Sequence, residues 1–363
     1  MTTGSVLQSI PNAAIQTHSV FEQPWWLEAT APGQWGESVV KRGDEVVGRL
    51  PYAVKKRLGV TVLSHPVLTP TLGPWLRSTP GKYVKQLEDE KHLMAELIEQ
   101  LPPFHVFQQN FSPAVTNWLP FYWAGFDATP RYTYRIPDIT DVDRVWDDCA
   151  HNVRRHVRKA AKELSLRADL GVDVLVELNH QIFQRQGLRM AYSAEFMHRL
   201  DRACAAHDAR TLLFAVDARE RVHAAAFLVH DTDVTYLLTS GVDTELRSSG
   251  AQSLLVWEAI RHAAARSRSF DFAGSMIESV ERFNRGFGAH AAHPGRRRRV
   301  REPRAARPHR GVRAWPRDSA RRPRRAQPAP RAARRRGRGD RGLRWATALT
   351  ALRQQVPRPC FRR

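Results

Sequence analysis

Apolar residues recur with strand and helix periodicity in both halves of the chain. In the first half, apolar and polar residues alternate as in strands, one long helix ends at a Pro-Pro pair, and an aromatic run follows. These are strands over 38–40, 45–54, 60–63, 105–111 and 131–136, a helix over 82–101 and a helix-like run over 114–126. The second half places helices before its strands. They are helices over 143–164, 174–188 and 195–207, strands over 211–216, 222–230, 234–240 and 269–273, and two helices, one beginning near 251 and one ending at Gly288.

The two halves form a weak internal repeat. Each runs strands, loop, amphipathic helix, a strand near a phenylalanine (Phe104 or Phe270) and a helix that ends at a glycine (Gly125 or Gly288). The first copy continues into a strand, whereas the second continues into arginine-rich sequence that does not suit a buried strand. We therefore predict an α/β fold with mixed sheets in two tandem units, the second lacking its last strand or strands. The predicted parts are a mobile leader at 1–20, units at 21–139 and 140–289, and a disordered tail at 290–363.

The formal net charge of +21 is concentrated in that tail. The tail holds 25 of the 57 basic residues and 3 of the 36 acidic ones, so residues 1–289 carry 32 basic and 33 acidic residues and a net charge of −1. A nearly neutral body predicts no specific nucleic-acid partner. Arginine, alanine, proline and glycine dominate the tail, and all four have GC-rich codons. We hypothesise a frameshift just after Ala289, and the alternative is an authentic arm that binds RNA or DNA.

The three cysteines, Cys149, Cys204 and Cys360, lie far apart and match no metal-ligand or redox spacing. This predicts reduced thiols and no metal site. The N-terminal stretch lacks a basic segment followed by an apolar run, and no stretch reaches the roughly 18 apolar residues of a membrane-spanning helix. We expect a cytoplasmic protein without a transmembrane segment.

A turn rich in small residues leads into the helix near 251. Its residues are Arg247, Ser248, Ser249, Gly250, Ala251 and Gln252. The first turn of a helix has unpaired N–H groups and the positive end of the helix dipole, and a glycine there lets an anion approach the backbone. The turn therefore predicts a phosphate-binding loop, with an ordinary polar connection as the alternative.

Four polar residues near the strands of the second half are candidates for catalysis. Asp271 lies between two phenylalanines on a strand, so its side chain points to the opposite face, where it could act as a general base, orient an acceptor or bond to a neighbouring turn. Ser275 and Glu278 follow that strand, where the sites of α/β proteins gather, although Ser275 also suits a helix N-cap. Tyr236 lies in mid-strand, where a tyrosine serves either the core or a site.

Motifs spread over residues 20–289 resemble the GNAT acyltransferases, in particular the branch that groups Fem-type peptidyltransferases with a related acetyltransferase family and has two GNAT-like units in tandem. The motifs are Pro24-Trp-Trp26, Gly73-Pro-Trp75, the aromatic run 117–126, Tyr132-Thr-Tyr134, the basic run 155–162, Phe270-Asp-Phe-Ala-Gly-Ser-Met276, Glu281-Arg-Phe283 and Gly286-Phe-Gly288.

The resemblance implies transfer of an acyl group from acetyl-CoA or another acyl-CoA to an amine acceptor, by direct attack on the thioester. The turn at 247–252 would correspond to the pyrophosphate loop, where Arg247 and Gly250 fit the family pattern and Gln252 replaces a small residue. The strand over 234–240 would splay from its neighbour and offer backbone N–H groups to the thioester carbonyl. The usual position of a general-acid tyrosine holds Asn284, so the identity of the acid and base stays open.

Two further functions remain open. One is an aminoacyl-tRNA-dependent peptidyltransferase acting on a cell-wall precursor, as in the Fem-type enzymes. The other is a non-catalytic remnant, or a protein that binds nucleic acid through its tail. Helical spacing places Arg154, Arg158 and Lys162 on one face. This face is either solvated surface or a contact for CoA phosphates, an acidic acceptor or aminoacyl-tRNA.

Overall fold

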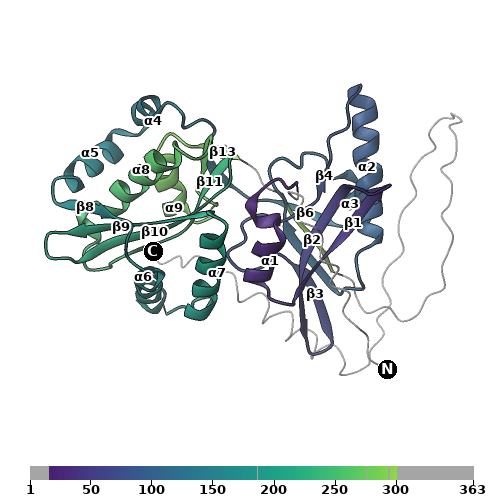
Figure 1. Cartoon of the computed structure of the whole chain (residues 1–363), viewed down its shortest axis with the longest axis horizontal. Helices are drawn as coiled ribbons and strands as arrows, with labels where there is room; N and C mark the ends of the chain where they lie inside the picture. Colours follow the sequence, from purple (N-terminus) through teal and green to yellow (C-terminus); the bar gives the residue numbers. More distant parts are fainter. Residues whose placement is uncertain (1–15, 186, 275, 293–294, 301–363) are drawn as a thin grey trace, which may run out of the picture. The chain divides into compact units, whose positions relative to one another are not determined.

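Two mixed β-sheets with packed helices make up the described residues, which are 16–185, 187–274, 276–292 and 295–300. The computed structural model divides the chain into two units after position 303, and all described residues lie in the first unit. Figure 1 shows the elements along the chain. The α/β class with mixed sheets, predicted from the sequence, is confirmed. Among the described residues, no helix combines the length and apolarity needed to cross a membrane.

The first sheet has the strand order β1, β2, β3, β5, β14, β6, and β4 pairs with β2. Its strands are β1 (Trp35–Arg42), β2 (Glu45–Arg57), β3 (Val60–Ser64), β4 (Trp75–Leu76), β5 (Val106–Asn110), β6 (Asp127–Pro130) and β14 (Gly295–Val300). β3 and β5 run parallel, joined by helix α2 (Tyr83–Glu99). Together with helix α3 (Leu119–Trp123), the sheet encloses a core of phenylalanines that includes Phe107, Phe121 and Phe126.

The second sheet has the order β13, β7, β12, β11, β10, β9, β8. Its strands are β7 (Thr133–Ile136), β8 (Leu164–Arg167), β9 (Arg210–Asp217), β10 (Val222–His230), β11 (Val234–Val242), β12 (Ser269–Asp271) and β13 (His290–Ala292). One face packs against helices α4 (Val142–Asp148), α5 (His151–Ala160) and α8 (Ala251–Ala263). The other packs against η1 (Val20–Glu22), α1 (Pro24–Thr30), α6 (Val172–Arg185) and α7 (Ala194–Ala206). The remaining helices are η2 (Arg247–Ser249) and α9 (Glu278–Arg285).

The single helix predicted over 143–164 is wrong, because the chain forms α4, α5 and then β8 there. Between the two helices Ala150 is extended and donates its N–H to the carbonyl of Gly286 at 2.8 Å. This long-range hydrogen bond replaces a helical one, which the local sequence pattern could not reveal.

Each half of the chain contributes a strand to the sheet of the other half. β7, predicted to close the first unit, pairs with β12 and β13 in the second sheet. β14 lies between β5 and β6 in the first sheet. Near the N-terminal end, Phe21 and Trp26 pack in the core of the second sheet. The boundary predicted between 139 and 140 therefore does not separate the two sheets.

The prediction that strands end at Ala289 is also wrong, because β13 and β14 follow it. Apolar alternation was the sequence signal for a strand, whereas strand pairing itself uses only backbone N–H and C=O groups. The rest of the predicted tail, residues 301–363, lies outside the described residues, as do residues 1–15 of the predicted leader.

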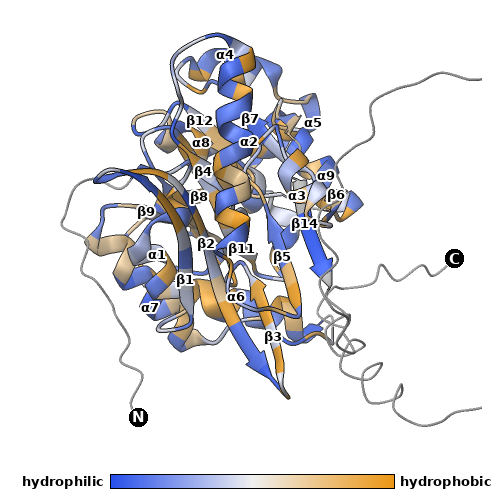
Figure 2. Ribbon diagram, turned by 90° about the vertical axis from the view of Figure 1, so that its right-hand side faces the viewer, coloured by the Kyte–Doolittle hydropathy of each residue, from blue (hydrophilic) through white to orange (hydrophobic). Residues whose placement is uncertain are grey.

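β14 is an unusual inner strand because it places arginine against an apolar core. Arg297 is only 6% exposed, and its guanidinium carbon lies 4.4 Å from the centre of the Trp118 ring and 5.3 Å from that of Phe111. Its Nε has no hydrogen-bond partner among the described residues, and burial lowers the pKa of the guanidinium to about 10. Figure 2 shows β14 in the colour of hydrophilic residues. Such a strand agrees with the frameshift hypothesis, which stays a prediction.

We expect Arg297→Leu to stabilise the protein by about 1–4 kcal/mol, because it replaces a buried charge that has no counterion by an apolar side chain. The cation–π contacts that the substitution removes contribute at most about 2 kcal/mol. Urea unfolding measures the difference. Arg298→Leu, on an exposed neighbour in the same strand, is the matched control and should bring no gain. Equal stabilisation by both variants would contradict the burial argument.

Candidate functional site

Three neighbouring strands of the second sheet place a row of polar side chains on one face. The register pairs Asp271 of β12 with Arg135 of β7 on one side and with Tyr236 of β11 on the other. Phe270 and Phe272 belong to the core on the opposite face, as the alternation of side chains along a strand requires. The structure thus orients Asp271 away from its flanking phenylalanines, as predicted.

The ladder between β11 and β12 ends at this row. Their parallel pairing ends at Tyr236 and Asp271, although β11 continues to Val242. Within the described residues, the rest of β11 has no partner strand on this side. A β-bulge at Leu238 lies at the same point, where β11 changes register against β10. The pairing of β11 with β12 therefore ends where the family resemblance implied a splay, and the rest of β11 is left without a strand partner on that side in the described part of the chain.

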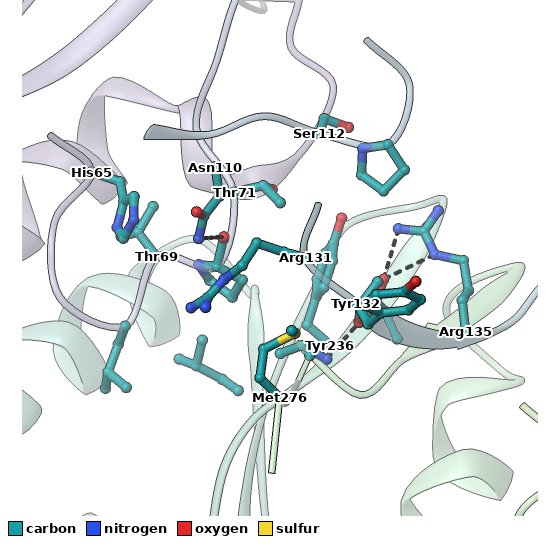
Figure 3. Close-up of a pocket in the computed structure, with 18 of the residues that line it drawn as sticks. His65, Thr69, Thr71, Asn110, Ser112, Arg131, Tyr132, Arg135, Tyr236 and Met276 are labelled. Carbon is teal, nitrogen blue, oxygen red and sulfur yellow. Dashed lines mark hydrogen bonds and ion pairs between the residues drawn. The ribbon is translucent and has the colours of Figure 1, made fainter. Parts of the chain in front are cut away.

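A cavity of about 330 Å³ lies over this row of side chains and beside the part of β11 that β12 does not pair (Figure 3). The second sheet contributes Tyr236, Leu238 and Asp271, and the other wall includes the loop 65–71 of the first half. Asn110 at the end of β5 holds that loop, since its Nδ2 donates to the carbonyl of Pro70 at 3.2 Å. The cavity therefore needs both halves of the chain.

Asp271 is 3% exposed and accepts four hydrogen bonds. Oδ1 accepts from Thr133 Oγ1 and, at 2.8 Å, from the Ala273 N–H. Oδ2 accepts from Arg135 Nε at 3.0 Å and Nη2 at 2.9 Å. A carboxylate has about four lone-pair sites, and all are in use. This arrangement favours a positioning role for Asp271 over that of a general base, which needs a free lone pair.

Arg135 is a fixed positive charge at the cavity wall. Burial is the largest single influence and opposes the charge of its guanidinium, but Asp271, Tyr236 and Asp231 together outweigh it, so the pKa of Arg135 is raised. The pair thus brings a cation to the cavity without leaving a buried charge uncompensated.

Tyr236 is 5% exposed, and the centre of its ring lies 4.6 Å from that of Phe21. Burial raises the pKa of its phenol well above the ordinary value, and the nearby carboxylates of Asp231 and Asp271 add to the effect. The hydroxyl therefore keeps its proton at neutral pH. The ring of Tyr236 packs in the core and its side chain also lines the cavity. Its protonated hydroxyl can act as a hydrogen-bond donor there.

The predicted phosphate-binding turn at 247–252 forms η2 and the first turn of α8, and does not line this cavity. Gly250 has a φ of +81°, and a Cβ there would lie 3.1 Å from the carbonyl oxygen of His156 in α5. The backbone N–H groups of Gly250 and Gln252 make no hydrogen bond with the described residues. Together with the exposed Arg247 they form a set of donors that fits an anion. The phosphate role stays a prediction.

The structure brings Asp271 and Tyr236 together and leaves Glu278 apart from them. Glu278 is exposed at the start of α9, pairs with Arg282 at 3.2 Å and does not line the cavity. Ser275 lies outside the described residues. No group of three or more His, Cys, Asp or Glu residues that could hold a metal ion occurs in the described part of the chain.

Several cavity residues were not identified from the sequence. Arg135 and Thr133 alternate with Tyr134 and Ile136, which belong to the core. That alternation was visible in the predicted strand. It would have placed Thr133 and Arg135 on the face opposite to the core. The loop 65–71 carried no such signal, because its place beside β11 depends on how the first sheet folds.

Comparison with known proteins identifies a family for the second half. Residues 147–284 match the family described as acetyltransferase (GNAT) domain. No curated protein matches the sequence of this chain. The described fold is similar to the crystal structure of FemX, with a TM-score of 0.58 and 14% identity, covering 77% of this chain and 92% of that one. At this identity the likeness concerns the fold alone.

Two other solved structures are less similar. A tandem GNAT protein from the clavulanic acid biosynthesis pathway, without AcCoA, has a TM-score of 0.49 and 12% identity, covering 76% of this chain and 86% of that one. L-PGS from Bacillus licheniformis has a TM-score of 0.46 and 8% identity, covering 80% and 95% respectively.

We predict that Asp271→Asn destabilises the protein by about 3 kcal/mol, because it leaves the Arg135 guanidinium without its counterion. Chemical unfolding of the variant and the wild type gives the difference. Asp169→Asn is the matched control: Asp169 pairs with Arg167 at 2.6 Å at an exposed site, and its loss should leave stability unchanged within error. If Asp271→Asn were as stable as the control, the ion pair would not be what holds β7 against β12.

Proposed function

We propose that this chain, which belongs to the GNAT superfamily through its domain at residues 147–284, is an N-acyltransferase whose transfer site is the cavity over Asp271. The observation that carries the proposal is that the pairing of β11 with β12 ends beside Tyr236 while β11 continues to Val242. Backbone N–H groups at such an opening can donate to the oxygen of an acyl carbonyl and stabilise the charge that develops on it during attack by an amine.

The proposed donor is an acyl-CoA, which when bound supplies an activated thioester. Residues 247–252 follow β11 in the chain. The acyl end of the donor would therefore bind at β11 and its phosphates at the turn that comes next. Arg247 and the N–H groups of Gly250 and Gln252 would bind the phosphates. The protonated Tyr236 hydroxyl would donate its proton to the leaving sulfur. The amine proton would pass to solvent, since Asp271 has no free lone pair.

One surface supports a different donor, an aminoacyl-tRNA, with a cell-wall precursor as the acceptor. Helix α5 carries exposed Arg155, Arg158 and Lys159, and it packs against the turn at Gly250. A basic surface next to the proposed phosphate-binding turn also suits a polyanion. The fold shared with FemX is compatible with this alternative.

Calorimetric titration of the full chain with acetyl-CoA separates the two donors. We expect saturable binding that the double variant Arg247→Gln, Gln252→Pro weakens, because it removes one cation and one backbone donor from the turn. Arg57→Gln, at an exposed position of β2, is the control for charge. Transfer from charged tRNA without any binding of CoA would select the second donor. Transfer from neither would favour a non-catalytic remnant.

Tyr236→Phe should lower the kcat of acyl transfer by about 100-fold or more while leaving KM nearly unchanged, because it removes the proton donor and retains the ring. Steady-state kinetics with the donor identified above provides the measurement. Tyr122→Phe, on an exposed tyrosine of α3, is the matched control. An unchanged kcat in Tyr236→Phe would rule out a role for this hydroxyl in the reaction.

A further inference from the structure

The guanidinium of Arg131 lines the cavity, and no lining carboxylate pairs with it. The cavity is lined by two guanidinium groups, those of Arg131 and Arg135, and by one carboxylate, that of Asp271. Asp271 is fully occupied by Arg135, Thr133 and a backbone N–H. Arg131 makes no ion pair or hydrogen bond with any described residue. The lining of the cavity therefore carries one positive charge in excess.

The backbone on both sides of Arg131 is fixed, so this charge has a defined place. Arg131 lies between Pro130 at the end of β6 in the first sheet and Thr133 at the start of β7 in the second. Gly274 packs on the same segment, because a Cβ there would lie 2.9 Å from the carbonyl oxygen of Tyr132. Figure 3 shows the side chain of Arg131 extending among the residues that line the cavity. It is half-buried, so its guanidinium is only partly screened by solvent.

A half-buried guanidinium that has no counterion in the described part of the chain has the chemistry of an anion-binding group. Its planar array of N–H donors matches the oxygens of a carboxylate or phosphate, and two parallel charge-assisted hydrogen bonds add direction to the attraction. We propose that Arg131 binds an anionic group, a carboxylate or a phosphate, on the acceptor amine. This inference rests on the proposed transfer site: it names the class of acceptor as an amine that also carries an anion.

The acceptor class follows from where the two cations lie in the cavity. Arg135 is held on the sheet by Asp271, next to the proposed position of the acyl carbonyl, and its charge is already compensated. Arg131 lies at the crossing between the sheets, on the other side of Thr133 along the chain. An acceptor with separate amine and anionic groups can occupy both regions, whereas a simple alkylamine leaves Arg131 without a partner.

Two pairs of amines that differ in one anionic group test the proposal. The pairs are glycylglycine with glycylglycine amide, and phosphoethanolamine with ethanolamine. Binding to the full chain is measured by calorimetry without any acyl donor, at constant ionic strength. In at least one pair, the anionic member should bind about tenfold or more tightly than the neutral member. The pair that shows the larger difference identifies the anion as carboxylate or phosphate.

Arg131→Gln should abolish this preference and leave binding of the neutral member unchanged, and Arg131→Lys should retain part of it, as a charge without the planar donor array. Arg57→Gln controls for loss of one exposed positive charge, and any anion binding by the arginine-rich sequence after 300 is common to all variants. Equal binding within both pairs, or a preference that survives in Arg131→Gln, would overturn the proposal. Because no acyl donor is present, Tyr236→Phe should retain the preference for the anionic member. If the transfer reaction fails, the binding preference still tests this inference separately.

Discussion

The carboxylate of Asp271 is the contact on which the arrangement of the candidate site depends. It joins β12 to β7 through Arg135 and Thr133 and holds the turn after β12 through the N–H of Ala273. Because the group is buried, each of these bonds replaces a contact with water that the side chain lost on folding. These bonds fix Asp271 and Arg135 on two neighbouring strands beside Tyr236, and a site for group transfer requires groups held in fixed positions.

A second constraint is the exchange of strands between the halves. β7 comes from the end of the first half and completes the second sheet, while β14 comes from the end of the second half and fills a position in the first. The segment that carries Arg131 is the connection between β6 in one sheet and β7 in the other. The cavity is consequently built where the chain passes between sheets, and its lining includes side chains from both halves. Neither half of the sequence alone contains all of its residues.

The exchange also explains why β14 forms despite its composition. Strand pairing satisfies backbone groups of β5 and β6 that would otherwise lie open at the middle of the first sheet. The side chain of Arg297 opposes this pairing, since it is buried against Phe111 and Trp118 without a counterion among the residues that the structure describes. The backbone of β14 thus favours its place in the sheet, and the side chain of Arg297 opposes it. The same conflict would arise if an out-of-frame sequence occupied a position meant for an apolar strand, as the frameshift hypothesis supposes.

The sequence by itself determined the fold class, the order of most helices and strands, and the face of Asp271, because these follow from the local period of apolar residues. Its motifs also indicated the GNAT family and the turn around Gly250. Only the tertiary structure decided that β7 and β14 exchange sheets, that Arg131 lies in the cavity and that Glu278 does not. These facts depend on which backbone groups pair across long distances in the chain, and a local pattern carries no record of the partner strand. The hydrogen bonds of Asp271 illustrate the difference. The sequence predicted the direction of its side chain, and the fold supplied Arg135, which donates two of the four bonds.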